Sequence, residues 1–431
     1  MLSLAENIDF LSRLPKPGDS WIDRGGSRSD LASSLVEMRG FGSNPGNLRM
    51  FAYVPARLQR PHALVVVLHG CAQSAASYDL GSGWSTLAKH YGFAVVLPQQ
   101  EHVNNANVCF NWSKPDDIAR GCGEACSIRQ MVARMVHDHG IDPQCVFVTG
   151  MSAGGAMASV MLATYPEVFA GGAIIAGLPF GIATNLREAL NAMRCPTPRP
   201  AAVLGDLVRN ASRHRGVFPK VSVWHGSLDR IVNPTNADEI VKQWLDVHHL
   251  PDVPMSEGVI DGYPRQVWWN ADGDTLIESY AITNMGHGTP VGRADDERHY
   301  GKPNGFMLDV GISSSHHIAE FFRLTHSTPV TRPARPASPS TKLIPAVSWM
   351  APPAPVKVEA SRVAEPALAV AARVEVPPPP VPLRAKLQAP PPSPLKPTEA
   401  KPNVSMQRPH PTLGRVYHAI ARKLVAAGLR K

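Results

Sequence analysis

The sequence contains no long hydrophobic run and no recognisable leader. Its apolar stretches fall well short of the roughly 20 residues that a membrane-spanning helix needs. The N-terminus, MLSLAENIDFLSRLPKPGDS, lacks a basic start, and Glu6 and Asp9 interrupt any apolar segment, so we expect no secretory signal peptide. These absences favour a soluble protein, for which a cytoplasmic location is one expectation.

Acidic residues and cysteines are scarce in one part of the chain. Residues 327–431 contain no Asp, no Cys and four Glu, but 22 of the 42 prolines and 16 Lys and Arg, which gives a net charge of +12. Residues 1–326 carry 27 Lys and Arg against 31 Asp and Glu, a net charge of −4. The overall charge of +8 therefore describes the tail. Because residues 1–326 are slightly acidic, the overall positive charge does not indicate that this part of the chain binds nucleic acid.

The tail divides into two segments by composition. Residues 327–411 include PPPPVP and APPPSPLKP, which cannot bury enough apolar surface to offset chain entropy, so we predict disorder. Residues 412–431 recover a helical period, for which a transient solvated helix is the first expectation and a helix that contacts a granule or membrane surface is the alternative. The apolar side of that helix would carry Leu413, Val416, Ile420 and Leu424.

The body, residues 35–326, alternates predicted strands with predicted helices, and residues 1–34 form an N-terminal extension. Continuous apolar runs such as ALVVVLHG are typical of strands buried on both faces. The alternation predicts an α/β domain with a mostly parallel sheet and helices on both faces. Strands are expected at 48–55, 63–70, 93–98, 145–150, 171–177, 221–226 and 275–282, and helices at 82–92, 128–136, 153–165, 236–249 and 316–324.

One serine lies between glycines where a strand passes into a helix. Gly150-Met151-Ser152-Ala153-Gly154 fits G-x-S-x-G, in which the serine occupies a sharp turn and its neighbours must be small. The turn exposes the hydroxyl at the carboxyl edge of the sheet and directs the first helix amides at a developing negative charge. The motif predicts Ser152 as a nucleophile; the alternative is a tight glycine turn with an incidental serine.

A nucleophilic serine needs a base, and the base needs an orienting carboxylate, which in this arrangement follow in the order Ser, Asp or Glu, His. VWHGSLDRIVNP places Asp229 after a predicted strand, and NMGHGTPVG places His287 in a glycine-lined loop after the last strand. Asp229 could instead cap the following helix or be an exposed residue without a role. Less well placed candidates are Asp206, Asp238 and Asp246, and the histidines typical of surface or packing positions are His225, His248, His249, His316 and His317.

Two backbone amides are candidates for an oxyanion hole. The amide of Ala153 opens the helix after the serine, and the loop LHGCAQ after the first buried strand offers the amide of Cys71. A Cys–His hydrolase is a formal alternative, but no cysteine has the sequence context of Ser152. The six cysteines allow 15 complete pairings, and none of their spacings resembles a zinc ribbon. We expect no metal and no organic cofactor.

Taken in order, LHGC, NVCFNW, GMSAGGAM, HGSLDRIV and NMGHGTPVG resemble the poly(3-hydroxybutyrate) depolymerase esterase family over roughly residues 35–325. That family belongs to the α/β-hydrolase superfamily and has feruloyl and acetylxylan esterase relatives. The resemblance implies an α/β-hydrolase fold with Ser152 as nucleophile, His287 as general base and Asp229 as its partner. It implies ester substrates of the oligo- or poly(3-hydroxybutyrate) type, with a feruloyl- or acetylxylan-type ester as the alternative.

The resemblance carries further expectations. It places Phe110, Asn111 and Trp112 at the mouth of the active site as substrate-binding residues, and it implies a Cys71–Cys109 disulfide, with two free thiols as the alternative. Cys122 and Cys126 could also pair or remain separate. The resemblance implies an extracellular location, whereas the N-terminal sequence does not have the pattern of a signal peptide. A different reading makes the body a scaffold and the basic tail the functional part, bound to a granule or membrane.

Overall fold

The computed structural model describes residues 34–293 and 300–325. The predicted disordered segment at 327–411 and helix at 412–431 lie outside the described residues, as does nearly all of the predicted extension at 1–34. Within the described ranges, no helix is both long enough and apolar enough to cross a bilayer.

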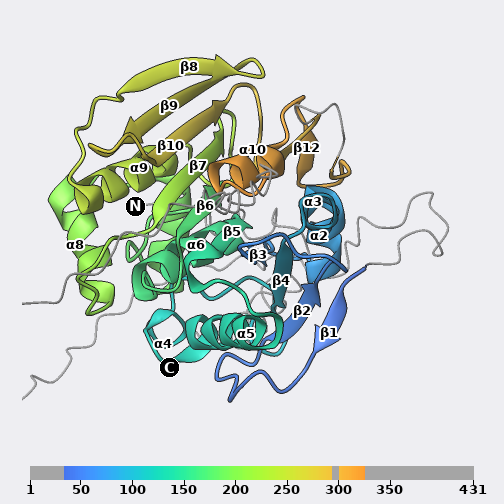
Figure 1. Ribbon diagram of the computed structural model, residues 1–431. Helices are drawn as coiled ribbons and strands as arrows, with labels where there is room; N and C mark the ends of the chain where they lie inside the picture. Colours follow the sequence, from blue (N-terminus) through green and yellow to red (C-terminus); the bar gives the residue numbers. More distant parts are fainter. Residues whose placement is uncertain (1–33, 294–299, 326–431) are drawn as a thin grey trace, which may run out of the picture. The chain divides into compact units, whose positions relative to one another are not determined.

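A ten-stranded sheet forms the centre of the domain, in the order β1-β2-β4-β3-β5-β6-β7-β10-β9-β8 (Figure 1). Strands β4, β3, β5, β6, β7 and β10 are mutually parallel, and β1, β2, β9 and β8 add antiparallel edges. The strands are β1 (Val36–Met38), β2 (Arg49–Tyr53), β3 (Leu64–Leu68), β4 (Ala94–Gln99), β5 (Val146–Met151), β6 (Gly171–Ile175), β7 (Lys220–Gly226), β8 (Ser256–Ile260), β9 (Tyr263–Trp269) and β10 (Thr275–Ile282). A separate parallel pair joins β11 (Thr289–Val291) to β12 (Met307–Asp309).

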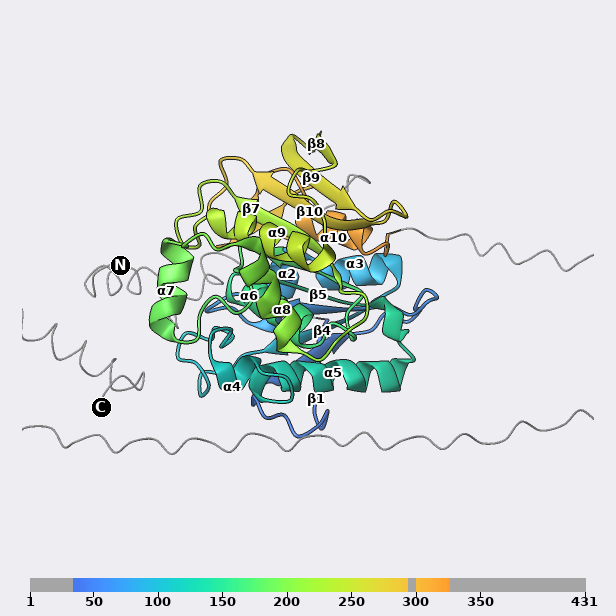
Figure 2. The same ribbon diagram turned by 90° about the vertical axis from the view of Figure 1, so that its left-hand side faces the viewer.

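Helices cover both faces of the sheet, and Figure 2 shows β4 and β5 between α5 and α3. Successive side chains of a strand point to opposite faces. Val66 and Val148 accordingly join one core with α5 and α6, while Val65 and Phe147 join another with α2, α3 and α10. The helices are α2 (Ala75–Ser82), α3 (Trp84–Tyr91), α4 (Pro115–Ile118), α5 (Gly123–His139), α6 (Ala153–Thr164), α7 (Leu186–Arg194), α8 (Ala201–Ala211), α9 (Thr235–His248) and α10 (Ser314–Phe321), with a 3-10 turn at Pro143–Cys145.

All seven predicted strands and all five predicted helices are present, and the expected fold class is confirmed. The sequence did not predict the β8–β9 hairpin. Four of the five β8 residues are exposed, and β9 contains Pro264, so neither strand has the buried apolar pattern on which the other predictions depend.

The parallel strands determine where the chemistry can gather. Because β5, β6, β7 and β10 are consecutive neighbours and run in one direction, the loops at their carboxyl ends lie at one edge of the sheet. Ser152 follows β5, Asp229 follows β7 and His287 follows β10. The topology therefore brings three residues that are far apart in the sequence to the same edge.

Candidate active site

Ser152 has a strained backbone at the junction of β5 and α6. Its φ of 57° and ψ of −119° lie in a region that residues with a side chain rarely adopt. The backbone amide of Ser152 donates to the carbonyl of Ile175 at the end of β6, at 2.9 Å. This conformation is that of the strand-to-helix turn expected for G-x-S-x-G.

Two glycines allow the chain to make this turn. A Cβ on Gly150 would lie 2.4 Å from the carbonyl oxygen of Gly154. A Cβ on Gly154 would lie 2.2 Å from the carbonyl oxygen of Leu68 and 2.5 Å from that of His69. Because these neighbours are backbone atoms, a side chain on Gly150 would force α6 away from β5, and one on Gly154 would force α6 away from the end of β3. The glycines are therefore required by close backbone contacts, as the motif indicated.

Asp229 and His287 are in direct contact. The Nδ1 atom of His287 lies 2.7 Å from Oδ2 of Asp229. A carboxylate only accepts, so Nδ1 carries the proton and Nε2 is left to accept one. The other oxygen of Asp229 accepts from the backbone amides of Ile231 and Val232, each at 2.9 Å. These bonds hold the carboxylate in one orientation toward the imidazole.

The loops that carry this pair are joined by backbone hydrogen bonds. The amide of Ser227 donates to the carbonyl of Ile282 at 3.0 Å, and the amide of Leu228 donates to the carbonyl of Met285 at 2.9 Å. On the other side, the amide of Ala176 after β6 donates to the carbonyl of Trp224 at 2.8 Å. A continuous set of contacts thus runs from the Ser152 turn through β6 to the loops of Asp229 and His287.

His225 is a second imidazole on Asp229, whereas the sequence predicted a surface or packing role for it. Its Nε2 lies 3.1 Å from Oδ2 of Asp229 and 2.9 Å from the carbonyl of Val232, and its side chain is 3% exposed. Although burial opposes the charged carboxylate, the hydrogen bonds from His225 and His287 outweigh it and hold the pKa of Asp229 below its usual range. Asp229 is therefore ionised at neutral pH. The position of His225, four residues before Asp229, was the only hint in the sequence.

Asp206, Asp246 and His248 make their contacts elsewhere. Asp206 and Asp246 both pair with Arg209, at 2.8 and 2.6 Å. The Nε2 atom of His248 lies 3.0 Å from the carbonyl of Pro219, at the amino end of β7. These contacts are remote from the carboxyl edge that carries Ser152.

The amides of Ala153 and Cys71 are available to an oxyanion. Ala153 begins α6, and over residues 34–293 and 300–325 neither amide has a hydrogen-bond acceptor. The positive end of a helix dipole adds to the attraction for negative charge at Ala153. The predicted disulfide between Cys71 and Cys109 is present, while Cys122, Cys126, Cys145 and Cys195 are free. The disulfide joins the loop of the Cys71 amide to the segment that contains Trp112.

Residues 110–112 have different environments. Phe110 is 1% exposed and its ring lies 4.8 Å from that of His69, so it packs in the core. Asn111 is 6% exposed, and its backbone and side-chain amides both donate to the carboxyl group of Glu124. Neither side chain offers surface to a substrate. Trp112 is half-buried and packs against a cluster that includes Val232 of the Asp229 loop.

Glu124 holds residues 100–111 in place by hydrogen bonds, a role that the sequence did not indicate. Its carboxyl group accepts from Nδ2 of Asn111 at 2.7 Å and from Nε2 of Gln100 at 2.5 Å, while Gln100 also donates to the carbonyl of Cys109. Burial raises the pKa of Glu124 to about 8, against the effect of the hydrogen bonds from Asn111 and Gln100.

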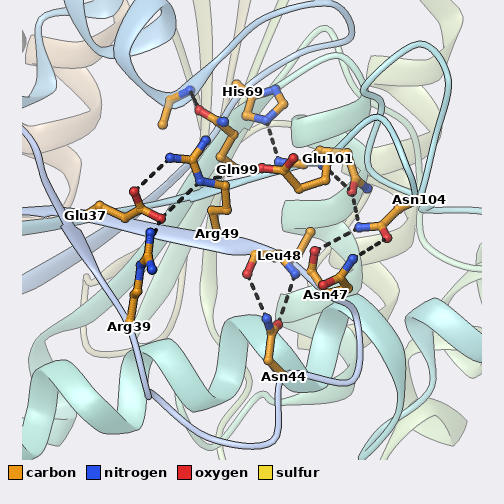
Figure 3. Close-up of polar contacts among 12 residues, drawn as sticks. Glu37, Arg39, Asn44, Asn47, Leu48, Arg49, His69, Gln99, Glu101 and Asn104 are labelled. Carbon is orange, nitrogen blue, oxygen red and sulfur yellow. Dashed lines mark hydrogen bonds and ion pairs between the residues drawn. The ribbon is translucent and has the colours of Figure 1, made fainter.

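The segment after β4 is also attached to the end of β3, to β2 and to the loop before β2 (Figure 3). The backbone amide of Gln100 donates to Nε2 of His69 at 3.1 Å, and the side chain of Asn104 donates to the carbonyl of Asn47 at 3.0 Å. Arg49 lies 3.6 Å from Glu101. These contacts give residues 99–112 a rigid base beside the Cys71 loop.

Comparison with known proteins places this arrangement in a family. The model of the family described as "Esterase PHB depolymerase" matches residues 49–257. Poly(3-hydroxyalkanoate) depolymerase C of Paucimonas lemoignei is 47% identical over 295 residues, which cover 68% of this chain and 71% of that protein. Feruloyl esterase B of Thermothelomyces thermophilus is 32% identical over 269 residues, covering 61% of this chain and 90% of that protein.

A solved structure agrees with these relatives. The acetyl xylan esterase from Aspergillus awamori superposes with a TM-score of 0.57 at 26% identity, and the match covers 68% of this chain and 99% of that one. The predicted α/β-hydrolase fold is confirmed by this similarity together with the mostly parallel sheet. The chain belongs to the PHB depolymerase esterase family and is a carboxylic ester hydrolase.

Proposed function

We propose that Ser152 is the nucleophile, His287 the general base and Asp229 its orienting carboxylate. The observation that carries this proposal is the 2.7 Å contact between Asp229 and Nδ1 of His287, at the sheet edge that also holds the strained Ser152 turn. Nε2 of His287 takes the proton of the Ser152 hydroxyl as its oxygen attacks the ester carbonyl. The amides of Ala153 and Cys71 stabilise the tetrahedral oxyanion.

The reaction then proceeds by acyl transfer to water. His287 returns its proton to the leaving alcohol, which leaves an acyl group on Ser152. Water gives a proton to His287 as its oxygen attacks the acyl carbon. The second tetrahedral intermediate then collapses, the bond to the Ser152 oxygen breaks as His287 returns the proton to that oxygen, and the acid is released. Ionised Asp229 stabilises the imidazolium in both steps.

The substrate we propose is an oligo- or poly(3-hydroxybutyrate)-type ester. The 47% identity to a poly(3-hydroxyalkanoate) depolymerase, over more of the chain than the feruloyl esterase match, supports this class. Trp112 is the residue of the 110–112 segment that we propose to contact substrate, because it retains exposed surface beside the Asp229 loop. The acetylxylan and feruloyl esterases among the relatives make a carbohydrate-linked ester the second candidate.

We propose an extracellular site of action. The Cys71–Cys109 disulfide supports it, because disulfides persist in oxidising compartments. A granule or membrane contact through residues 412–431 remains a prediction. Deleting residues 327–431 tests it: loss of granule association with retained hydrolysis would support an anchor, and unchanged association would contradict it.

The proposed site is tested by steady-state hydrolysis of 3-hydroxybutyrate oligomers, p-nitrophenyl butyrate and methyl ferulate. Ser152→Ala should lower kcat by roughly 10³-fold or more on every substrate that the wild type hydrolyses. Asp206→Asn is a matched control at an exposed carboxylate and should retain full activity. Equal rates for Ser152→Ala and the wild type would refute the nucleophile. A preference for methyl ferulate would leave the proposed triad intact but would replace the 3-hydroxybutyrate-type ester by a feruloyl-type ester as the proposed substrate.

A further inference from the structure

A cluster of two histidines and a glutamate lies on α10, apart from the proposed active site. His316 and His317 are 3% and 6% exposed, so they are interior residues rather than surface ones. His316, His317 and Glu320 each offer one ligand atom, and these atoms lie within 4.8 Å of one another. Helix α10 lies beside β7 (Figure 1).

The spacing of the cluster suits a small metal ion. Oε2 of Glu320 lies 3.1 Å from Nδ1 of His317 and 3.9 Å from Nδ1 of His316. Tetrahedral zinc with ligands at about 2.0–2.1 Å has neighbouring ligand atoms about 3.3–3.4 Å apart. The two separations from Glu320 fall on either side of this value, and all three ligand atoms lie within 4.8 Å of one another, so a bound ion would draw the two imidazole nitrogens closer together by side-chain rotation.

The outer nitrogens of both imidazoles already have partners. Nε2 of His317 lies 2.9 Å from Oδ2 of Asp261, in the turn between β8 and β9, and Nε2 of His316 lies 3.2 Å from the hydroxyl of Tyr91 on α3. A histidine that binds a metal usually donates its other ring N–H to such a partner, which sets the tautomer and the ring orientation. Here both rings direct Nδ1 toward the same Glu320 carboxylate.

The surroundings attract positive charge. Nδ1 of His317 lies 3.1 Å from Oε2 of Glu320, and its Nε2 lies 2.9 Å from Oδ2 of Asp261. His317 therefore occupies a place between two carboxylates where a cation is favoured. His317, Glu320 and Asp261 also line a cavity of about 660 Å³, which gives an ion a route from solvent.

We propose that His316, His317 and Glu320 form a binding site for a borderline divalent transition metal, of which Zn²⁺ is the representative. Two imidazoles and one carboxylate favour such ions over Ca²⁺ and Mg²⁺, which prefer oxygen ligands. The ion displaces the proton that His317 otherwise holds at Nδ1. Through Asp261 and Tyr91 it connects α10 to the β8–β9 turn and to α3, so its role is structural rather than catalytic.

The test uses the full chain without a histidine tag, treated with EDTA and then dialysed. Calorimetric titration with Zn²⁺ should show one equivalent bound, and Co²⁺ should give the visible absorption of a low-coordinate complex. His317→Gln and Glu320→Gln should each weaken Zn²⁺ binding on the order of 100-fold or more, and Asp261→Asn about 10- to 100-fold. His137→Gln, at an exposed helical histidine beside a carboxylate, should bind as the wild type does.

Stability provides a second readout. Zn²⁺ should raise the Tm of the wild type and of His137→Gln, but not that of Glu320→Gln, whose partly exposed side chain makes correct folding of the variant easy to achieve. Esterase activity confirms that each variant is folded, since none of these residues belongs to the proposed triad or oxyanion hole. If Zn²⁺ does not bind stoichiometrically, or if Glu320→Gln binds Zn²⁺ as tightly as the wild type does, the proposed metal site is refuted. His317 would then be an imidazole that donates hydrogen bonds to two carboxylates.

Discussion

The Cys71–Cys109 disulfide leads to a quantitative expectation for stability. It closes a loop with a sequence separation of 38. In the chain-entropy model a crosslink over about 40 residues removes roughly 13 cal/mol/K from the unfolded state, or about 4 kcal/mol at 25 °C. Both cysteines are half-buried, so serine at each position leaves no large cavity. The double variant Cys71→Ser/Cys109→Ser should therefore lose about 4 kcal/mol in the free energy of unfolding.

The assay is denaturation in guanidinium chloride, followed by tryptophan fluorescence and repeated by circular dichroism. The control is Cys122→Ser/Cys195→Ser, which removes two exposed free thiols and should leave stability within about 0.5 kcal/mol of the wild type. The double serine variant should also lose kcat/KM, by up to about 10²–10³-fold if the Cys71 amide no longer reaches the oxyanion. A loss of stability below about 1 kcal/mol would refute the reasoning and show that the contacts of Gln100 and Glu124 hold the segment without the crosslink.

Three further predictions concern the elements around the site. Gly154→Ala should lower the free energy of unfolding by about 1–3 kcal/mol in urea denaturation, because its Cβ would meet the Leu68 carbonyl. The control Gly258→Ala, with open space around the new Cβ, should be near neutral. A gain in stability for Gly154→Ala, which helix propensity alone predicts, would contradict the close contact. His225→Phe should lower stability by roughly 1.5–3 kcal/mol and lower kcat, because Asp229 loses a hydrogen bond to its charged form; unchanged kinetics would remove His225 from the site. Because the folded-state pKa of Glu124 is about 8, the folded protein keeps a proton that the unfolded chain releases, so the free energy of unfolding of the wild type should fall as pH rises from about 5 to 8. Relative to the wild type, Glu124→Gln should gain up to about 1.4 kcal/mol of stability per pH unit over this range. If the stability of both proteins depends on pH in the same way, Glu124 is ionised in the folded state.

The parts of the fold that the sequence predicted are those with a strong local pattern. The strand at 63–70 is apolar throughout because it is buried on both faces, and all five β3 residues are buried. The β8–β9 hairpin was missed because its residues pair at an exposed edge, where backbone hydrogen bonds rather than apolar side chains define the strands. The positions of Ser152, Asp229 and His287 could be predicted because each follows a recognisable strand.

Contacts between distant segments could not be read in the same way. The sequence predicted surface or packing roles for His225 and His317, because the local sequence around an imidazole in a strand or helix does not indicate its partner. Phe110 and Asn111 lie in a motif associated with the active-site mouth, yet the fold turns the first into the core and the second onto Glu124. Burial and pairing depend on which elements meet, and the local sequence does not contain that information.

By itself the sequence determined the period of each element, the glycine turn around Ser152 and the order of the three candidate residues. These are local properties, because side-chain pattern and backbone freedom act over a few residues. The tertiary structure alone decided that two imidazoles share Asp229, that Glu124 supports the segment beside the Cys71 loop and that three ligand atoms converge on α10. The reason is that such contacts join side chains 13 to 58 residues apart or depend on partners from other elements, and only packing of the whole sheet sets those distances.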